Sequence, residues 1–301
     1  MMQVNKVLNN FEIVGTQYSK KDETQEARKP FIKGIPILSV VILVLIILGC
    51  LFCELIMTHD PSRMFLDEIN RAPGSGHIFG TDTLGRDIWS MIWFGGRKSL
   101  IIGTVATVIS SFIAVVYGTL SGVAGETVDN IMMRFTEILL SIPSILLVVF
   151  MQAALGQRNF LGISVIIGIT SWMSIAKIVR AEVRKIRSEE YVLISKMMGG
   201  SFMHVLFKHL APNFMSSIMF MIVMSVRSAI VSESTLSFLG IGLPVEIITW
   251  GSMLSLSEKA LLTSSWWIIL IPGIFLVVTL LCITDIGNYI RGSYNSKEGN
   301  L

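Results

Sequence analysis

Charged residues are scarce in this chain of 301 residues: Asp, Glu, Lys and Arg make up only 15%, whereas hydrophobic residues make up 52%. Soluble domains carry roughly 25% charged residues, and a mean hydropathy of +0.69 exceeds what one soluble core needs. The net charge of +3 is small, and nucleic-acid binding would require a clustered basic face. Composition therefore predicts an integral membrane protein, with the lipid bilayer as a partner and no nucleic acid.

Cysteine is also rare, with three residues in the chain. Cys50 and Cys53 form a CxxC pair, which could indicate redox or metal chemistry, but all three cysteines lie in or beside apolar segments. We favour the interpretation that they are small packing residues. The first apolar run starts near Ile35 and is longer than the core of a signal peptide. We therefore do not expect the N-terminus to be a signal peptide.

Several catalytic motifs are absent. No GxxxxGK[ST] occurs, so the chain is not expected to hydrolyse ATP through a P-loop. No HExxH or repeated CxxC suggests a metal enzyme, and no GxSxG suggests a hydrolase. The sequence predicts a protein that is not an enzyme and holds no cofactor or metal of its own.

Apolar runs of about 20 residues, the length that crosses a bilayer as a helix, occur six times. They span residues 35–57, 99–123, 131–154, 161–179, 214–236 and 265–286, and Pro143 is expected to kink the third. Five basic residues lie between positions 20 and 33, which places the N-terminus inside. The fold class is therefore all-α with six transmembrane helices. Residues 1–34 and 289–301 are expected to be cytoplasmic tails, and residues 58–98 an extracytoplasmic loop.

The longest polar interruption in the later part of the chain is the basic stretch 180–213, which belongs on the cytoplasmic side. Residues 190–198 read as a short helix, and Gly199-Gly200 then allows a sharp turn. A second helical piece, 201–210, is expected to end at Pro212. Two short helices at an angle make a docking surface for a soluble partner.

Two further segments carry polar motifs. One is HIFGTDTLGRDIWS, whose His77, Asp82, Arg86 and Asp87 could form a metal or catalytic cluster. We favour a structural role in which Asp82 and Asp87 organise the turns around two glycines and pair with Arg86. The other is ESTLSFLGIGLPVEIITWGSML between the last two spans, which glycines and proline interrupt. We interpret it as a re-entrant or surface-lying loop on the outer face.

Ionisable residues within apolar spans are costly and indicate function. Arg227 lies near the middle of its span, and a pathway for a charged substrate and a structural role remain equally open for it. Glu233 is a second candidate for the pathway, or a weak ion-pair partner of Arg227. Glu137 is a third candidate for the pathway, but for Glu137 and Asp285, near span ends, an interfacial role is favoured. A metal relay of the methionines between positions 197 and 224 is less favoured than simple packing.

The run EYVLISKMMG, followed after nine residues by HLAP, resembles the cytoplasmic EAA loop of binding-protein-dependent ABC importer permeases. The matching positions are Glu190, Tyr191, Gly199, His209, Pro212 and Asn213. Leu193, Ile194 and Ser195 replace the Glu-Ala-Ala of the family. HIFGTDTLGRD and ESTLSFLGIGLP…WGSML resemble segments of the C-type subunit of dipeptide, oligopeptide and nickel permeases. The resemblance covers residues 35–292.

The resemblance implies a type I importer permease fold, with a five-helix permease domain at 99–288 and a coupling loop at about 181–212. In this loop, ATPase coupling would rest on Glu190, Tyr191, Gly199, Gly200, His209 and Pro212. The implied partners are a homologous second permease, two ATPase subunits that hold ATP and Mg, and an extracytoplasmic solute-binding protein, all at a bacterial inner membrane. Short peptides are the favoured substrate, with nickel or a metallophore complex as the alternative. A secondary transporter driven by ion gradients is the alternative of another class.

Overall fold

The computed structural model describes residues 35–156, 159–197, 211–256, 260 and 264–298, which are predominantly helical and contain no β-strand beyond one bridge between Thr81 and Asp87. All of them except Ile35 belong to one unit, Pro36–Leu301. The elements are α1 Ile37–Leu51, α2 Cys53–Ile56, η2 Leu66–Glu68, α3 Ile88–Val123, α4 Glu126–Leu140, α5 Ser144–Leu155, α6 Phe160–Ser171, α7 Met173–Arg187, α8 Glu190–Met197, α10 Ala211–Phe238, α11 Trp250–Ser255 and α13 Trp267–Glu298.

Three segments in the described part are long and apolar enough to cross a membrane alone, namely Ile88–Val123, Ile218–Phe238 and Trp267–Ser293. The count rises to five if each of two bent pairs, α4 with α5 and α6 with α7, forms one span. Helix α1 is apolar but has 15 residues, about 22 Å at 1.5 Å per residue. The protein is thus an all-α, multi-pass membrane protein, while the count of six spans stays a prediction.

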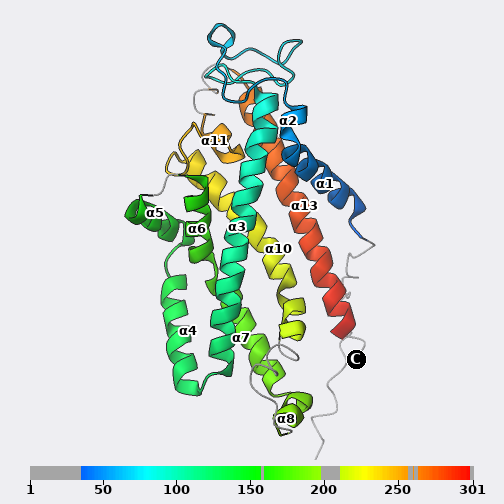
Figure 1. The fold of residues 1–301 in the computed structure, drawn as a ribbon, viewed down its shortest axis with the longest axis vertical. Helices are drawn as coiled ribbons and strands as arrows, with labels where there is room; N and C mark the ends of the chain where they lie inside the picture. The colour runs from blue at the N-terminus through cyan, green and yellow to red at the C-terminus, as the bar shows by residue number, and fades with distance from the viewer. Residues whose placement is uncertain (1–34, 157–158, 198–210, 257–259, 261–263, 299–301) are drawn as a thin grey trace, which may run out of the picture. The chain divides into compact units, whose positions relative to one another are not determined.

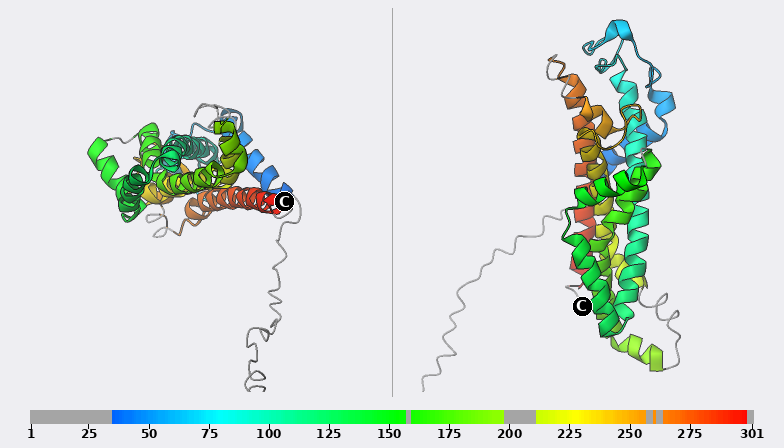
Figure 2. Two further views of the ribbon diagram at one scale, coloured as in Figure 1. Left: turned by 90° about the horizontal axis from the view of Figure 1, so that it is seen from below. Right: turned by 90° about the vertical axis from the view of Figure 1, so that its left-hand side faces the viewer.

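Helix α3 is the central element, with α1, α6, α7 and α10 packed around its 36 residues (Figures 1 and 2). Small residues allow this packing. A Cβ on Gly103 would lie 2.7 Å from the Ile230 side chain of α10, and a Cβ on Gly118 would lie 2.6 Å from the Ala176 carbonyl of α7. Glycine therefore lets the backbones of α7 and α10 approach α3 closely, as is typical of helices in membranes.

Two helices extend beyond the ranges that we expected for the spans. Helix α3 starts at Ile88 instead of residue 99, because Asp87 caps its N-terminus by accepting a hydrogen bond from the Ser90 N–H, 2.9 Å away. The expected extracytoplasmic loop 58–98 therefore gives its last eleven residues to this helix. At the other end of the chain, α13 continues to Glu298 through most of the expected tail 289–301.

Two expected continuous spans are interrupted. The expected kink at Pro143 is a break of 89° between α4 and α5, because proline cannot donate the hydrogen bond that would continue α4. The next pair bends by 44° at Trp172. Helix α7 then runs on to Arg187, into the expected coupling loop, because Val179, Val183 and Ile186 form one buried stripe.

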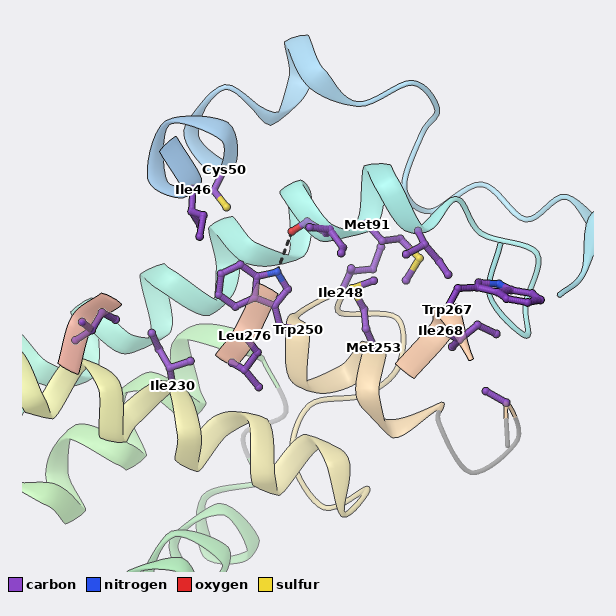
Figure 3. Packing of buried hydrophobic residues seen from close by; sticks show 14 residues of the cluster. Ile46, Cys50, Met91, Ile230, Ile248, Trp250, Met253, Trp267, Ile268 and Leu276 are labelled. Carbon is purple, nitrogen blue, oxygen red and sulfur yellow. Dashed lines mark hydrogen bonds between the residues drawn. The ribbon is translucent and has the colours of Figure 1, made fainter. Parts of the chain in front are cut away.

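The loop 57–87 and α11 lie together at one end of the helices, opposite α8 (Figure 1). The Arg86 Nη1 atom donates to the Val245 carbonyl at 3.2 Å, and the Trp267 indole donates to the Thr81 carbonyl at 3.1 Å. Beneath them, the Trp250 indole packs in a buried cluster and donates to the Ile92 carbonyl at 3.0 Å (Figure 3). The polar loops are thus fixed to the helix ends.

Candidate functional site

A groove of about 440 Å³ lies between the α4–α5 break, the α6–α7 bend and α10. Seven hydroxyl residues line it together with apolar side chains: Ser144, Thr170, Ser171, Ser174, Ser225, Ser228 and Ser232. Both helix interruptions border the groove, through Pro143 on one side and through Thr170–Ser174 on the other. Interrupted backbone at membrane depth is tolerated where it lines a cavity. The interruptions therefore belong to the site.

One face of α10 forms the far wall of the groove. Met221, Ser225, Ser228 and Ser232 line it, and their spacing of i, i+4, i+7 and i+11 places them along one side of a helix. Hydrocarbon offers hydroxyl groups no hydrogen-bond partner, so this face is better suited to water, a polar solute or another protein than to lipid. These serines were not among the expected site residues, although their spacing is visible in the sequence, because small residues in a span also indicate helix packing.

Arg227 is half-buried and adjoins the groove without being part of its lining. It follows Met224, a lining residue, by three positions, and so lies on a neighbouring part of the same helix surface. Its Nε is buried and has no hydrogen-bond partner among the described residues. A buried donor without a partner is costly, which keeps Arg227 a candidate for contact with a solute.

Glu233 is fully buried and faces α11. Its Oε1 accepts hydrogen bonds from Thr249 Oγ1 at 2.8 Å and from Ser237 Oγ at 2.9 Å. Thr249 is the N-cap of α11, and Gly251 lets this helix approach, since a Cβ there would lie 3.1 Å from Glu233 Oε1. Glu233 therefore joins α10 to α11. It makes no contact with Arg227 among the interactions of the described residues and does not line the groove.

Glu137 lies on α4, two residues before Leu139 at the groove. It pairs with Arg134 at 3.4 Å and with Lys177 of α7 at 3.9 Å, and its side chain is half exposed. These contacts fit the interfacial role that we favoured for it. Asp285 similarly accepts a hydrogen bond from Ser39 of α1 at 2.8 Å.

The far end of the helices carries the expected coupling residues. Helix α8 begins at Glu190, whose side chain is exposed, and ends at Met197, close to the expected range 190–198. Val192 is fully buried in a cluster with Val183, Ile186 and Ile218, whereas Ile194 and Met197 are exposed. The helix is thus anchored by one side chain and presents two apolar side chains outward.

Most of the other coupling positions fall outside the described residues: Gly199, Gly200 and His209, along with the expected second helix 201–210. Tyr191 lies in α8, but only its backbone is described. Pro212 stands in the first turn of α10, Ala211–Phe238. The helix that it was expected to end lies outside the described residues. The first turn tolerates proline because its N–H groups have no partner within the helix.

A buried acidic residue near this end was not anticipated. Asp129, in the first turn of α4, is fully buried and receives a hydrogen bond from Arg180 Nε at 2.6 Å, with Arg184 Nη2 3.3 Å away. Arg187 donates to the Val123 carbonyl at 2.8 Å. These arginines attach α7 to the turn between α3 and α4.

The candidate metal or catalytic cluster of the loop is held in hydrogen bonds. Asp82 accepts from the N–H groups of Leu84 and Arg86 and pairs with Arg86 Nε, each at 2.8 Å, which confirms the expected turn. Asp87 instead lies 2.7 Å from His77 Nδ1, whose Nε2 is 2.7 Å from Glu68.

His59, His77 and Asp87 are close enough to form a three-ligand group, but both ring nitrogens of His77 already contact carboxylates. These residues fit a structural role, in which hydrogen bonds hold the loop 57–87 together, better than a metal centre.

The family model described as binding-protein-dependent transport system inner membrane component matches residues 114–291. The chain is 37% identical over 257 residues to the oligopeptide transport system permease protein OppC of Bacillus subtilis, covering 85% of this chain and 84% of that protein. It is 36% identical to the dipeptide transport system permease protein DppC of the same organism, covering 79% and 74%. With OppC of Escherichia coli K12 the identity is 35%, and the match covers 91% of each chain.

Proposed function

Since this chain belongs to the family of binding-protein-dependent transport system inner membrane components, we propose that it passes short peptides across the membrane through the hydroxyl-lined groove. Membership confirms the family that the sequence motifs indicated and makes the chain a transport permease, not an enzyme. The relatives named above are peptide permeases and give no support to the alternative of an ion-gradient transporter. Peptides are the proposed substrate because the relatives that carry a substrate in their names are peptide permeases.

The groove carries this proposal. It lies where two interrupted pairs meet α10, it is lined by seven hydroxyls, and Arg227 adjoins it with a buried Nε that lacks a partner among the described residues. Hydroxyl groups and a guanidinium suit the backbone amides and the terminal carboxylate of a peptide. The groove is open on one side, so a second, homologous permease subunit would close the pathway.

The two ends of the helices have different proposed partners. The exposed apolar side chains of α8 would dock on one of two ATPase subunits, which would hold ATP and Mg. A solute-binding protein would deliver the peptide at the opposite end, where the loop 57–87 and α11 lie. Closure of the ATPases would move α8, and the Asp129–Arg180 contact would carry this movement to the α3–α4 turn. Alternating access would follow from the rearrangement of the two permease subunits.

The proposed orientation places α8 and both termini in the cytoplasm. Cysteine substitutions in a background without Cys50, Cys53 and Cys282 would test it with a membrane-impermeant thiol reagent. Ser75→Cys and Glu246→Cys should react in intact cells, whereas Ser188→Cys should react only after the cells are opened. Labelling of position 188 in intact cells would contradict the orientation.

Uptake by the transporter reconstituted with its co-expressed subunits tests the pathway. Ser228→Trp fills the groove and should reduce peptide uptake at least tenfold, because the indole takes the place of the peptide. Val231→Trp is the matched control, since Val231 lies on the same helix, is exposed and does not line the groove. Equal uptake by the two variants would contradict the pathway. Uptake of nickel without peptide uptake would reassign the substrate.

A further inference from the structure

A second groove, of about 520 Å³, lies on the other side of α10. Helices α1, α3, α10 and α13 form it, and its walls are almost entirely aliphatic: Leu43, Ile47, Cys50, Leu51, Leu100, Ile101, Thr104, Val105, Val223, Val226, Ile283 and Ile286, with Arg97 at one end. We propose that this groove binds one anionic phospholipid, with an acyl chain along the aliphatic walls and the phosphate at Arg97.

The dimensions of the groove fit an acyl chain. Its wall on α3 extends from Arg97 to Val105, which is about 12 Å at 1.5 Å per residue. Helix α1 contributes Leu43, Ile47, Cys50 and Leu51 to the opposite wall, and α13 contributes Ile283 and Ile286. Thr104 donates its hydroxyl to the Leu100 carbonyl of its own helix at 2.8 Å, so it adds no unsatisfied group. The interior of the groove therefore suits a linear aliphatic ligand.

The charge at the end of the groove selects the headgroup. Arg97 is the one charged residue among the described residues that line the groove. Its side chain forms an ion pair at 3.4 Å with Glu54, whose side chain is 72% exposed. Such an exposed pair is weak, and it engages only one of the five N–H donors of the guanidinium. Lys98 follows directly and lies over the Phe94 ring at 4.6 Å. Arg97, the cation at the end of this apolar groove, suits a phosphate, because arginine binds phosphate through two parallel hydrogen bonds.

The position of the groove favours lipid over a protein partner. Val223 and Val226 line it, whereas Met221, Ser225 and Ser228 line the hydroxyl groove. Residues two positions apart on a helix point in roughly opposite directions, so the two grooves lie on opposite faces of α10. If the hydroxyl groove faces the second permease, the aliphatic groove faces the bilayer. This choice of occupant rests on the proposed function, whereas the charge and shape of the groove do not.

Native mass spectrometry of the assembled transporter, released from nanodiscs that contain equal amounts of phosphatidylglycerol and phosphatidylcholine, tests the proposal. Wild type should retain phosphatidylglycerol preferentially. Arg97→Gln should reduce that retention roughly tenfold, because a charge-assisted contact is lost, and Arg97→Lys should keep most of it. Thr104→Trp, which fills the groove, should release the lipid while Arg97 remains. Arg134→Gln is the control, because Arg134 also pairs with a glutamate at 3.4 Å but lines neither groove.

Equal retention by wild type, Arg97→Gln and Thr104→Trp would overturn the proposal, as would equal retention of the two lipids by wild type. Cross-linking of Thr104→Cys to another subunit of the transporter would assign the groove to a protein and would also overturn it. The measurement of lipid retention does not depend on transport. Peptide uptake measured on the same preparations therefore distinguishes a failure of the lipid proposal from a failure of the proposed peptide pathway.

Discussion

Asp129 is the residue on which the attachment of α7 depends. It is fully buried and accepts hydrogen bonds from Arg180, while Ser121 also donates to it. Asp129→Asn keeps the shape but removes the charge, so we expect the free energy of unfolding to fall by about 2 kcal/mol, the range for hydrogen bonds to charged groups. Thermal unfolding in detergent measures this loss.

Glu137→Gln is the matched control for Asp129→Asn. Glu137 pairs with Arg134 and Lys177 on an exposed surface, where ion pairs contribute at most about 1 kcal/mol. Equal destabilisation by the two substitutions would show that Asp129 has no special role at the α3–α4 turn.

Glu68 gives the loop 57–87 a dependence on pH. The hydrogen bond from His77, together with the nearby charge of Arg71, lowers the pKa of Glu68 below its usual range. A carboxyl group whose pKa is lower in the folded state stabilises the fold above its unfolded pKa, about 4.3. That stabilisation is lost as the pH falls through the folded pKa.

Hydrogen exchange of the backbone amides in 66–82, corrected for intrinsic rates, should therefore be slow at neutral pH and faster below about pH 4. Glu68→Gln should remove most of this change, because its side chain does not titrate in that range. A pH response that is the same in the variant and in wild type would mean that another group controls the loop.

Among the elements, the pairing of α3 with α7 is the most sensitive to side-chain size. A Cβ on Gly118 would lie 2.6 Å from the Ala176 carbonyl and 2.8 Å from Val179 Cβ. Gly118→Ala must separate the helices and should destabilise the protein by roughly 1–3 kcal/mol. Gly273→Ala on α13 is the control: no atom lies within 4 Å of its Cβ, and alanine is favoured over glycine in a helix by up to about 1 kcal/mol. An equal fall in the melting temperatures of Gly118→Ala and Gly273→Ala would contradict the close packing of α3 against α7.

Helix α8 is the element proposed to contact the ATPases. Met197 is 88% exposed, whereas Val192 anchors the helix in the core. Met197→Glu places a charge on the apolar surface and should reduce co-purification of the ATPases several-fold, with an unchanged amount of permease in the membrane. Met197→Leu should retain them, because the apolar surface is kept. Normal co-purification and normal uptake in Met197→Glu would exclude this surface as the docking site.

Some features of these elements could be predicted from the sequence, and others could not. The start of helix α8 at Glu190 was predicted, whereas Gly199-Gly200, expected to end it, lies outside the described residues. The bend at Trp172 was not foreseen, because no proline or glycine marks it. The role of Asp129 was not predicted, since its partner Arg180 is 51 positions away and such a contact leaves no local pattern.

The hydroxyl groove could not be predicted either, because it depends on contacts between helices. The spacing of Ser225, Ser228 and Ser232 is visible in the sequence, but only the placement of α10 against the two interrupted pairs shows that they share a groove. Conversely, charge alone drew attention to Glu233, which the fold uses to join α10 to α11. Intramembrane charge indicates importance, but it does not distinguish a pathway from a helix contact.

At the scale of the whole molecule, the proposed pathway, coupling helix and delivery end form one mechanism. Helix α8 lies at one end of the helices, and the loop 57–87 and α11 lie at the other (Figure 1). The hydroxyl groove is lined by residues of α4, α5, α6, α7 and α10. ATP-driven movement of α8 would then open the groove toward the end where the peptide is delivered. The central claim is that the peptide contacts this groove during transport.

Photo-cross-linking during turnover tests that claim most directly. The reconstituted transporter, with its ATPases and binding protein, is supplied with a short peptide that carries a photoreactive side chain, and adducts are mapped by mass spectrometry. We expect ATP-dependent adducts on the groove face of α10, at Met221, Ser225 and Ser228, and none at Val231. Adducts that avoid this face, or that form equally at Val231 or without ATP, would contradict the account.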